Sequence, residues 1–545
     1  MHTFVQPVLE MLDVRGQRQF GNAGIGKSQF ARPEFDTVRQ VIKWAGGCRH
    51  YTVSMNEISR RLYALAEVRE LDHRAIVSGI PGYQLMQRAA TACWQEMARR
   101  WPLARKVHVI CGAGNNGGDG FEIARLAFKA GCTVKLWALD PTASSGDAEI
   151  ARKAWLAQGG VATLMAEMDL SDAEVVVDAL FGIGLSRLME GAALQAIQSM
   201  QRAKQNGVKV LSVDVPSGLD AESGKIWGDA VAADVTVTFI GDKLGLHTGA
   251  GKDHAGEVIC HQLDIPAALF EGVPSQALLM SADDLARGLA PRKLNSHKGH
   301  HGHVLLIGGN RGMAGAIQLA GRAALHAGAG LVSVATRAEH KVALTAAQPE
   351  LMCHAVESQT QLLPLLQQAD VIAIGPGLGQ DAWARELLAR VLQSQLPLVL
   401  DADALNLLAE EPMRSERWVL TPHPGEAARL LDLTTSEIQN DRGAAARQIQ
   451  RQYGGVVVLK GAGTLVQGAQ SHLCPYGNPG MAVGGMGDVL TGIIAAFIAQ
   501  GLAAEQAAAA AVLAHALAGD QAAKTGQRGL LPSDVIAVLR GIVNP

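Results

Sequence analysis

The chain lacks the features that mark several large classes of protein. Its seven cysteines are scattered, odd in number and without a Cys-x-x-Cys pair, which argues against a disulfide framework and a zinc site and favours a cytoplasmic protein. The formal net charge is -3, so no basic surface for nucleic acid or an anionic membrane is expected. No apolar run reaches the roughly 18 residues of a membrane span, and residues 1–50 hold no signal-peptide core. The expected partners are small molecules.

What the chain does contain is a repeated alternation of apolar strands and helical segments. Its 545 residues exceed what one hydrophobic core normally serves, so two domains are expected. Helical segments separate the strands of a first series, which indicates a parallel, doubly wound sheet. These strands are predicted at residues 107–111, 133–137, 174–180, 209–215 and 234–240. Ahead of them, residues 59–76 have helical spacing, with Leu62 and Leu71 on one face.

A second strand–helix series follows a less regular stretch at residues 262–295. Its strands are predicted to begin near residues 303, 330, 370, 397, 418 and 456. The sequence therefore predicts an α/β protein of two tandem domains with a boundary near residue 275. We assign residues 55–275 to the first domain, residues 276–545 to the second, and leave residues 1–54 as an unassigned N-terminal extension.

The stretch HVICGAGNNGGDG, residues 108–120, places an acid in a glycine-rich loop between a strand and a helix predicted from residue 121. Glycines and a helix N-terminus favour phosphate, which Asp119 would repel. A dinucleotide-binding fingerprint carries its acid about 20 residues later, on the ribose. We therefore expect this loop to hold something besides a pyrophosphate.

Two more acids, Asp178 and Asp214, follow neighbouring predicted strands. Ligands of open parallel sheets bind beyond the carboxyl ends of the strands, so these acids and Asp119 should face one crevice. Carboxylates gathered in this way require a bound cation, a raised pKa or strong hydrogen bonds. Either acid alone is more often a turn or helix cap, but together with the glycine loops they favour a site.

These motifs carry a specific resemblance. NNGGDG, VDALFGIG and VDVPSGLDAESG resemble the epimerase domain of the bifunctional NAD(P)H-hydrate repair enzymes, over roughly residues 56–270. The resemblance implies a Rossmann-like domain that binds a nicotinamide nucleotide hydrated at C6 of its ring, and a potassium ion held by Asn116, Asp178 and Ser217. Oxygen ligands of this kind suit a hard cation. The implied substrate-binding residues are Asn115, Asn116, Gly117, Gly118, Asp119, Gly182, Ile183, Gly184, Leu185, Ser186, Arg187, Leu188 and Asp214. Asp214 is our candidate for moving protons on and off the hydroxyl of the carbon that is inverted.

A second glycine-rich motif, GGMGD at residues 484–488, leads directly into an apolar helix. Its glycines and the helix N-terminus would form an anion hole for a transferring phosphate. Asp488 at the mouth could accept a proton from an attacking hydroxyl, and Lys460 would supply the cation that phosphoryl transfer needs. A glycine-rich turn before a buried helix would explain the glycines but not the acid.

With IGPGLG, DADALN and TPHPGE at residues 374–379, 401–406 and 421–426, this motif resembles the ribokinase-like dehydratase domain of the same enzymes, over roughly residues 280–541. The resemblance implies ADP-dependent phosphorylation of the C6 hydroxyl of the S epimer, followed by loss of phosphate to give NAD(P)H and AMP, with magnesium as cofactor. It implies substrate binding at Ala316, Gly377, His423 and Asp488. ADP binding is implied at Lys460, Gly461, Ala462, Gly463, Thr464 and Gly487.

Other interpretations remain open at this stage. A eukaryotic messenger-RNA decapping scaffold uses a fold similar to the first domain as a binding module, which the near-neutral charge and the second enzyme-like domain disfavour. A small-metabolite kinase of the thiamine-pathway kind, fused to a non-catalytic nucleotide-binding domain, is the alternative for the second half. The run HKGHHGH, residues 297–303, invites a metal site, but we expect a structural role because His303 begins a buried strand. A homo-oligomer is expected.

Overall fold

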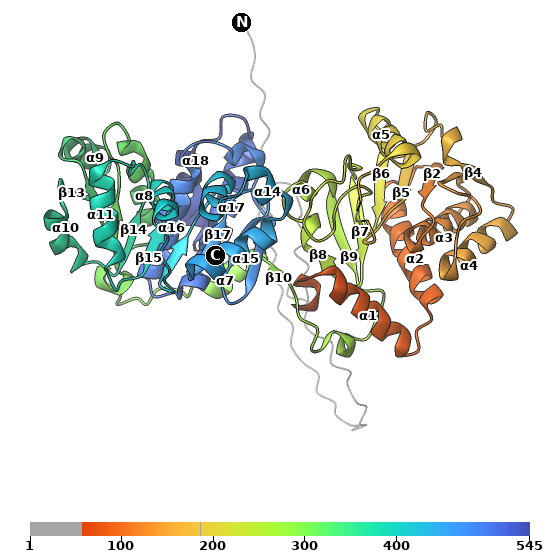
Figure 1. The fold of residues 1–545 in the computed structure, drawn as a ribbon, viewed down its shortest axis with the longest axis horizontal. Helices are drawn as coiled ribbons and strands as arrows, with labels where there is room; N and C mark the ends of the chain where they lie inside the picture. Colours follow the sequence, from red (N-terminus) through yellow and green to blue (C-terminus); the bar gives the residue numbers. More distant parts are fainter. Residues whose placement is uncertain (1–56, 186, 545) are drawn as a thin grey trace, which may run out of the picture. The chain divides into compact units, whose positions relative to one another are not determined.

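The computed structural model describes residues 57–185 and 187–544, in which the first strand series forms a seven-stranded parallel sheet ordered β4-β3-β2-β5-β6-β7-β9 (Figure 1). Its strands are β2 Lys106–Cys111, β3 Thr133–Ala138, β4 Ala162–Leu164, β5 Val175–Ala179, β6 Lys209–Val213, β7 Val235–Phe239 and β9 Glu257–His261. The helices of this part are α1 Leu65–Val77, α2 Gly82–Arg100, α3 Asn115–Lys129, α4 Gly146–Ala157, α5 Gly191–Gln205 and α6 Gly251–His254.

Both faces of this sheet are buried, as the continuous apolar strands predict. Val107 and Val109 of β2 belong to one hydrophobic cluster and Ile110 to the cluster on the opposite face. Burial on both faces is characteristic of a doubly wound parallel sheet. The carboxyl ends of β2, β5 and β6 are adjacent in the strand order, which brings Gly112, Asp178 and Asp214 to one edge.

The second series forms most of a 12-stranded sheet, ordered β13-β12-β11-β14-β15-β16-β17-β18-β19-β10-β1-β8. Its strands are β10 Ala277–Leu279, β11 His303–Ile307, β12 Leu331–Thr336, β13 Met352–Ala355, β14 Val371–Ile374, β15 Leu398–Leu400, β16 Trp418–Leu420, β17 Val456–Leu459, β18 Thr464–Gln467 and β19 Ser471–Cys474, with β1 Arg61–Tyr63 and β8 Asp242–Lys243 at the edge. The helices are α7 Ala282–Gly288, α8 Ala314–His326, α9 Lys341–Ala347, α10 Gln359–Leu366, α11 Ala382–Leu392, α12 Asp403–Glu410, α13 Pro424–Leu431, α14 Thr435–Asn440, α15 Arg442–Tyr453, α16 Met486–Ala499, α17 Ala504–Ala522 and α18 Pro532–Ile542.

The parallel part of this sheet runs from β13 to β17, and β18 and β19 follow as antiparallel strands. The predicted α/β class with two tandem strand–helix series is confirmed. Within the described residues, no helix is both long enough and apolar enough to cross a membrane.

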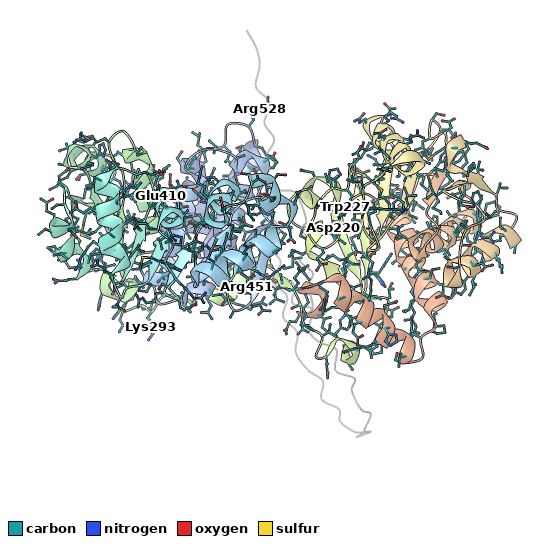
Figure 2. The ribbon with its side chains drawn as sticks, in the orientation of Figure 1. Asp220, Trp227, Lys293, Glu410, Arg451 and Arg528 are labelled. Carbon is teal, nitrogen blue, oxygen red and sulfur yellow. The ribbon has the colours of Figure 1, made fainter. Side chains whose placement is uncertain are left out.

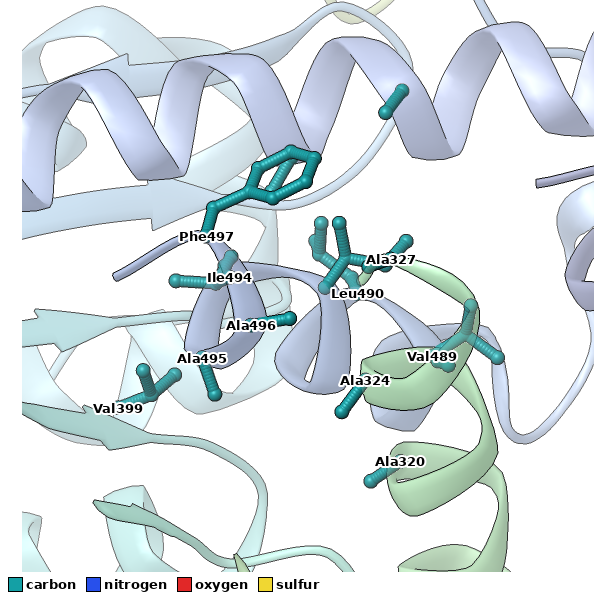
Figure 3. Packing of buried hydrophobic residues seen from close by; sticks show 14 of the residues in the cluster. Ala320, Ala324, Ala327, Val399, Val489, Leu490, Ile494, Ala495, Ala496 and Phe497 are labelled. Carbon is teal, nitrogen blue, oxygen red and sulfur yellow. The ribbon is translucent and has the colours of Figure 1, made fainter. Parts of the chain in front are cut away.

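Helix α16 packs against α8 in the larger core, where Val489 lies near Ala324 (Figure 3). The two helices approach so closely that a Cβ added to Gly492 would lie 2.1 Å from the carbonyl oxygen of Ala320. Glycine at that position therefore permits the close approach of α16 to α8.

The prediction of a helix over residues 59–76 is wrong for the first residues of that range. Residues 57–60 form a short 3₁₀ turn, β1 follows, and α1 begins at Leu65. Leu62 is fully buried and pairs with Ala277 on β10 and with Asp242 on β8. Pairing with strands distant in sequence overrides the local helical periodicity at this point.

Candidate active sites

A cavity of about 650 Å³ opens at the carboxyl ends of β2, β5 and β6. The predicted site residues that line it are Asn115, Asn116, Asp119, Gly182, Ile183, Gly184, Leu185, Arg187 and Asp214. Gly117 and Gly118 are buried and do not line it, and Leu188 is 60% exposed outside it. Ser186 lies outside the described residues. The structure therefore brings most of the first predicted site into one cavity.

The motif at residues 115–120 forms the first turns of α3, so the prediction of a loop that lasts until residue 120 is wrong. A Cβ on Gly112 would lie 2.0 Å from the carbonyl oxygen of Leu180, and one on Gly117 would lie 1.9 Å from the carbonyl oxygen of Gly112. These two glycines let the chain turn from β2 into α3 within a few residues. The N-terminus of α3, with its partial positive charge, therefore faces the cavity.

Asp178 and Ser217 are fully buried beside this cavity and hydrogen bonded to each other. Ser217 donates to the Asp178 carboxyl from its Oγ at 2.6 Å and from its backbone N–H at 2.8 Å, and Ser212 Oγ donates at 2.9 Å. Burial raises the pKa of Asp178, while these hydrogen bonds oppose the shift. Ser217 Oγ also accepts from the backbone N–H of Phe181 at 2.9 Å.

The three residues predicted to hold potassium offer carboxyl, hydroxyl and amide oxygens, the kind of ligand that a hard cation takes. Asp178 and Ser217 are in direct contact, whereas Asn116 Oδ1 lies 3.2 Å from the position that a Cβ on Gly182 would take. In residues 57–185 and 187–544, no three His, Cys, Asp or Glu side chains are grouped to hold a metal ion. A cation here would therefore depend on the neutral oxygen donors together with one carboxylate.

Asp214 follows β6 with a φ of +64°, a left-handed conformation that is strained for a residue with a side chain. Its Oδ1 accepts from Lys243 Nζ at 2.5 Å and from Thr238 Oγ1 at 3.0 Å. Its Oδ2 lies 3.3 Å from the position that a Cβ on Gly182 would take. One carboxylate oxygen is thus held by the protein, and the other lies against a cavity-lining loop.

The loop after Asp214 is held in place by its own polar contacts. Trp227 Nε1 donates to Asp220 Oδ2 at 3.2 Å, and Lys225 Nζ lies 4.1 Å from the centre of the Trp227 ring (Figure 2). Such contacts stabilise the strained backbone at the head of the loop.

Asp119 lies in α3, is 9% exposed and lines the same cavity as Asp214. Burial raises the pKa of Asp119 well above its usual value, and the Asp214 carboxylate raises it further. Burial therefore favours the protonated form of Asp119, which can donate a hydrogen bond into the cavity. Two acids in different surroundings thus line one cavity, one of them buried without a basic partner in the part of the chain that the structure describes and the other paired with lysine.

The GGMGD motif forms the start of α16, as predicted. Gly485 has a φ of +97°, the helix begins at Met486, and Asp488 lies in its first turn. A Cβ on Gly487 would lie 3.1 Å from Lys460 Nζ, so the lysine ammonium lies against the helix N-terminus. The predicted cation and the predicted anion hole are therefore side by side.

Two acids that the sequence interpretation missed surround Lys460. Asp401 Oδ1 accepts from Lys460 Nζ at 2.7 Å, and Glu426 Oε2 lies 3.7 Å from the same atom. Burial lowers the pKa of Lys460, but the two carboxylates outweigh it and the net pKa is raised. Both acids stand in quoted motifs, DADALN and TPHPGE, immediately after predicted strands, which is the signal that could have identified them.

Burial raises the pKa of Asp488 to about 7, with the Asp401 carboxylate adding to the shift and Lys460 opposing it. A carboxyl group with this pKa exchanges protons at neutral pH, as a general base must. Its position in the first turn of α16 places it next to the glycines that would bind phosphate.

The other residues predicted for the second site lie in the first turn of α8, in the loop after β14 and at the N-cap of α13. A Cβ on Gly377 would lie 3.2 Å from Ala316 Cβ, so these two positions are in contact. His423 caps α13 by accepting from the backbone N–H of Gly425 at 2.9 Å, and its side chain is 51% exposed. Burial lowers the pKa of His423, and Lys460 lowers it further. His423 therefore offers a neutral ring beside the lysine.

The predicted ADP-binding residues 460–464 form the turn from β17 to β18. Gly461 and Gly463 have φ values of +136° and +66°, which favour glycine. The histidine run lies elsewhere: His297 and His300 stack with ring centres 3.7 Å apart, and His303 Nε2 lies 2.9 Å from Ser333 Oγ in the buried start of β11.

Comparison with known proteins identifies the family. Residues 304–540 match the model described as NAD(P)H-hydrate dehydratase, and residues 82–245 match that of the YjeF-related protein N-terminus. The chain is 46% identical to the bifunctional NAD(P)H-hydrate repair enzyme Nnr of Coxiella burnetii, over 89% of this chain and 99% of the relative. The chain belongs to the bifunctional NAD(P)H-hydrate repair enzymes. It is therefore an enzyme with an epimerase part and a dehydratase part.

Further relatives of this repair enzyme family cover the chain in whole or in part. The Escherichia coli enzyme Nnr is 42% identical over 91% of this chain and 96% of its own length. A ribokinase-like superfamily protein of Enterococcus faecalis is 37% identical, covers 49% of this chain and 96% of its own, and superposes with a TM-score of 0.47. The resemblance inferred from NNGGDG and GGMGD is confirmed at the level of the family and its two activities.

Proposed function

We propose that the cavity at Asp214 interconverts the R and S hydrates of NADH and NADPH, and that the site at Asp488 dehydrates the S form with ADP. We assign the first activity to residues 55–275 and the second to residues 276–545. The observation that carries the proposal is that one chain holds both a cavity with a lysine-paired acid and a helix N-terminus with an acid of pKa about 7 beside a lysine. The first site then supplies the second with the epimer that it consumes.

In the first site, the hydrated nucleotide is bound by those of residues 115–119 and 182–187 that line the cavity, with its C6 hydroxyl at Asp214. Protonated Asp119 donates its proton to the C6 hydroxyl, the C6–O bond breaks and water leaves. The free Oδ2 of Asp214, whose Oδ1 is held by Lys243, accepts a proton from the water that then adds to the opposite face of C6, and this proton returns to Asp119 before the next turnover. The acid and base roles are thus divided between two carboxyl groups. Potassium held by Asn116, Asp178 and Ser217 would supply positive charge next to the nucleotide.

In the second site, Ala316, Gly377 and His423 hold the S hydrate with its C6 hydroxyl at Asp488. Asp488 accepts the hydroxyl proton as the oxygen attacks the β-phosphate of ADP, which releases AMP. Phosphorylation has turned a poor leaving group into a good one. Phosphate then leaves from C6 as C5 loses a proton to water, and the C5=C6 double bond of the reduced nicotinamide is restored. Lys460, the amides of residues 461–464 and Gly487 offset the charge of the transferring group.

Magnesium fits the charge of the second site. Asp401, Glu426 and Asp488 bring three carboxyl groups to one lysine, which leaves an excess of negative charge before the ADP phosphates arrive. Magnesium binds through one or two carboxylates together with substrate phosphates and water. Asp401 and Glu426 are the carboxylates that would hold it, and it would neutralise charge on the diphosphate.

We also propose that the enzyme is cytoplasmic and homo-oligomeric. The six cysteines of the described chain are unpaired, which suits a reducing compartment. Symmetric homo-oligomers are the commonest assemblies of soluble proteins, and light scattering of the purified chain tests the oligomeric state.

Incubation with hydrated NADH and ADP tests the proposed activities, with the absorbance of the restored nicotinamide as the readout. Recovery of NADH together with AMP and phosphate supports the proposal. No recovery, together with phosphorylation of another alcohol, would favour the small-metabolite kinase instead.

A further inference from the structure

Arg442 is a fully buried arginine without an acidic partner among the described residues. It is the first residue of α15, a helix capped by Asp441, which accepts from the backbone N–H of Ala444 at 2.8 Å. Burial lowers the pKa of Arg442 to about 10, so the side chain remains charged at neutral pH. Burying a charge of this kind costs free energy unless hydrogen bonds to the protein replace those to water.

The guanidinium of Arg442 contacts two parts of the chain: the turn at residues 460–464 and the segment that follows β8. Its Nη2 donates to the carbonyl oxygens of Leu459 and Lys460, each at 3.1 Å. Its Nε donates to Thr248 Oγ1 at 3.0 Å. A Cβ on Gly461 would lie 3.0 Å from Nη1, so the guanidinium lies directly against the turn backbone.

Thr248 is fully buried and belongs to residues 242–249, the segment that starts with β8 and carries Lys243, the partner of Asp214. Thr248 Oγ1 donates to the carbonyl oxygen of Gly463 at 3.1 Å. The backbone N–H of Gly249 donates to the carbonyl oxygen of Ala462, also at 3.1 Å. A Cβ on Gly463 would lie 2.1 Å from the carbonyl oxygen of His247. The turn thus packs without a gap against a segment from the epimerase part.

These contacts fix the direction of the turn amides. The carbonyl oxygens of Lys460, Ala462 and Gly463 are all bound by Thr248, Gly249 or Arg442. The backbone N–H groups of Gly461, Ala462 and Gly463 make no hydrogen bond within the described structure. The C=O of one residue and the N–H of the next belong to one peptide unit and point in opposite directions. Holding the carbonyl oxygens of Lys460 and Ala462 on one side therefore presents the N–H groups of Gly461 and Gly463 on the other.

We infer that Thr248 and Arg442 are positioning residues that orient the amides of Gly461 and Gly463 toward the phosphates of ADP, so that ADP affinity depends on a segment of the epimerase part. The inference rests on the proposed binding of ADP at residues 460–464. Neither side chain touches the nucleotide: Thr248 acts through the turn carbonyls, and Arg442 adds positive charge behind the turn. The first part of the chain therefore contributes to the second reaction by holding its nucleotide-binding turn.

The test is ADP affinity of the full chain, measured by isothermal titration. Thr248→Val keeps the shape but removes the hydroxyl, and we expect ADP to bind about tenfold more weakly. The KM for hydrated NADH and the rate of epimer exchange should not change, because neither site contacts Thr248. Thr248→Ser, which keeps the hydroxyl, should restore wild-type affinity. Thr236→Val is the matched control: it also removes a buried hydroxyl, one that donates to the carbonyl oxygen of Ala255 at 2.6 Å.

The outcomes separate this inference from the proposed function. A wild-type chain that binds no ADP would overturn both. A wild-type chain that binds ADP while Thr248→Val binds it equally well would overturn the inference alone, as would equal weakening by Thr248→Val and Thr236→Val. If Thr248→Val does not fold, Arg442→Lys decides by the same titration, because lysine cannot donate to Thr248 and to both carbonyls together.

Discussion

Lys243 Nζ lies 2.5 Å from Asp214 Oδ1, across 29 residues of sequence, and both side chains line the first cavity. The lysine side chain is 1% exposed and also donates to Thr238 Oγ1 at 2.6 Å. Lys243 therefore fixes one oxygen of Asp214 and leaves the other for the substrate.

Replacing Lys243 by methionine should slow epimer exchange about tenfold or more, because Asp214 loses the group that holds its reactive orientation. NMR exchange between the R and S hydrates measures the rate. Lys209→Met, at an exposed lysine on β6, is the control and should leave the rate unchanged. Equal rates for Lys243→Met and the wild type would remove Lys243 from the mechanism.

Potassium should stabilise the first part of the enzyme, since it would bind the folded site at Asp178 and Ser217. At a potassium concentration about 100-fold above its Kd, the expected gain is about 2.7 kcal/mol. Melting curves in potassium chloride and in choline chloride measure the difference. Asp178→Asn should abolish it, and a difference that survives in this variant would place the ion elsewhere.

The dehydratase rate should depend on the ionisation of Asp488. Because burial raises the pKa of Asp488 to about 7, the basic form is scarce below that pH, and kcat/KM should rise up to pH 7 and level off above it. Asp488→Asn should lower kcat by about 100- to 10,000-fold. A pH profile that stays flat from pH 5 to pH 8 would argue against Asp488 as the base.

The Asp488 carboxyl group should also make the folded chain less stable as the pH rises, whereas it makes the enzyme more active. The pKa of Asp488 is higher in the folded chain than in the unfolded chain, where it is about 4, so stability is lost as the pH rises from about 4 to about 7. Asp488→Asn should therefore lose less stability over that range, which urea unfolding at both ends of it measures.

A side chain at Gly487 should obstruct the anion hole. The Cβ of Gly487→Ala would lie 3.1 Å from Lys460 Nζ, where the phosphate must approach. We expect the dehydratase kcat to fall about tenfold or more, by loss of charge stabilisation at the transferring phosphate. Gly541→Ala, in α18 and outside the motif, is the control, since its Cβ would meet no atom within 4 Å. Equal activity of the two variants would contradict the assignment.

The fold was largely predictable from the sequence because buried parallel strands are continuous apolar runs, and the starts of the catalytic motifs coincide with strand ends. The start of α16 at Met486 followed from the glycines and the apolar helix alone. Residues 61–63 could not be assigned in this way, because their strand exists through pairing with β10 and β8, which are distant in sequence.

The candidate site residues could likewise be predicted where they stand in a local motif, but not where their role depends on a distant partner. Asp214 and Asp488 stand in short motifs, whereas Lys243, Asp401 and Arg442 acquire their roles from partners that are 17 to 194 residues away. A single sequence contains no signal for such pairings until the chain is folded. Glu426 is intermediate: it stands in a quoted motif, but its approach to Lys460 depends on the tertiary structure.

The central claim is that two sites of one chain act in series, and Asp214→Asn tests it most directly. A mixture of R and S hydrates is incubated with ADP, and the restored nicotinamide absorbance is followed for the wild type and the variant. The wild type should restore the whole mixture in one continuous reaction. The variant should restore the S fraction at the wild-type rate and then slow to the rate of spontaneous epimerisation. Restoration of the whole mixture by Asp214→Asn at the wild-type rate would contradict the account.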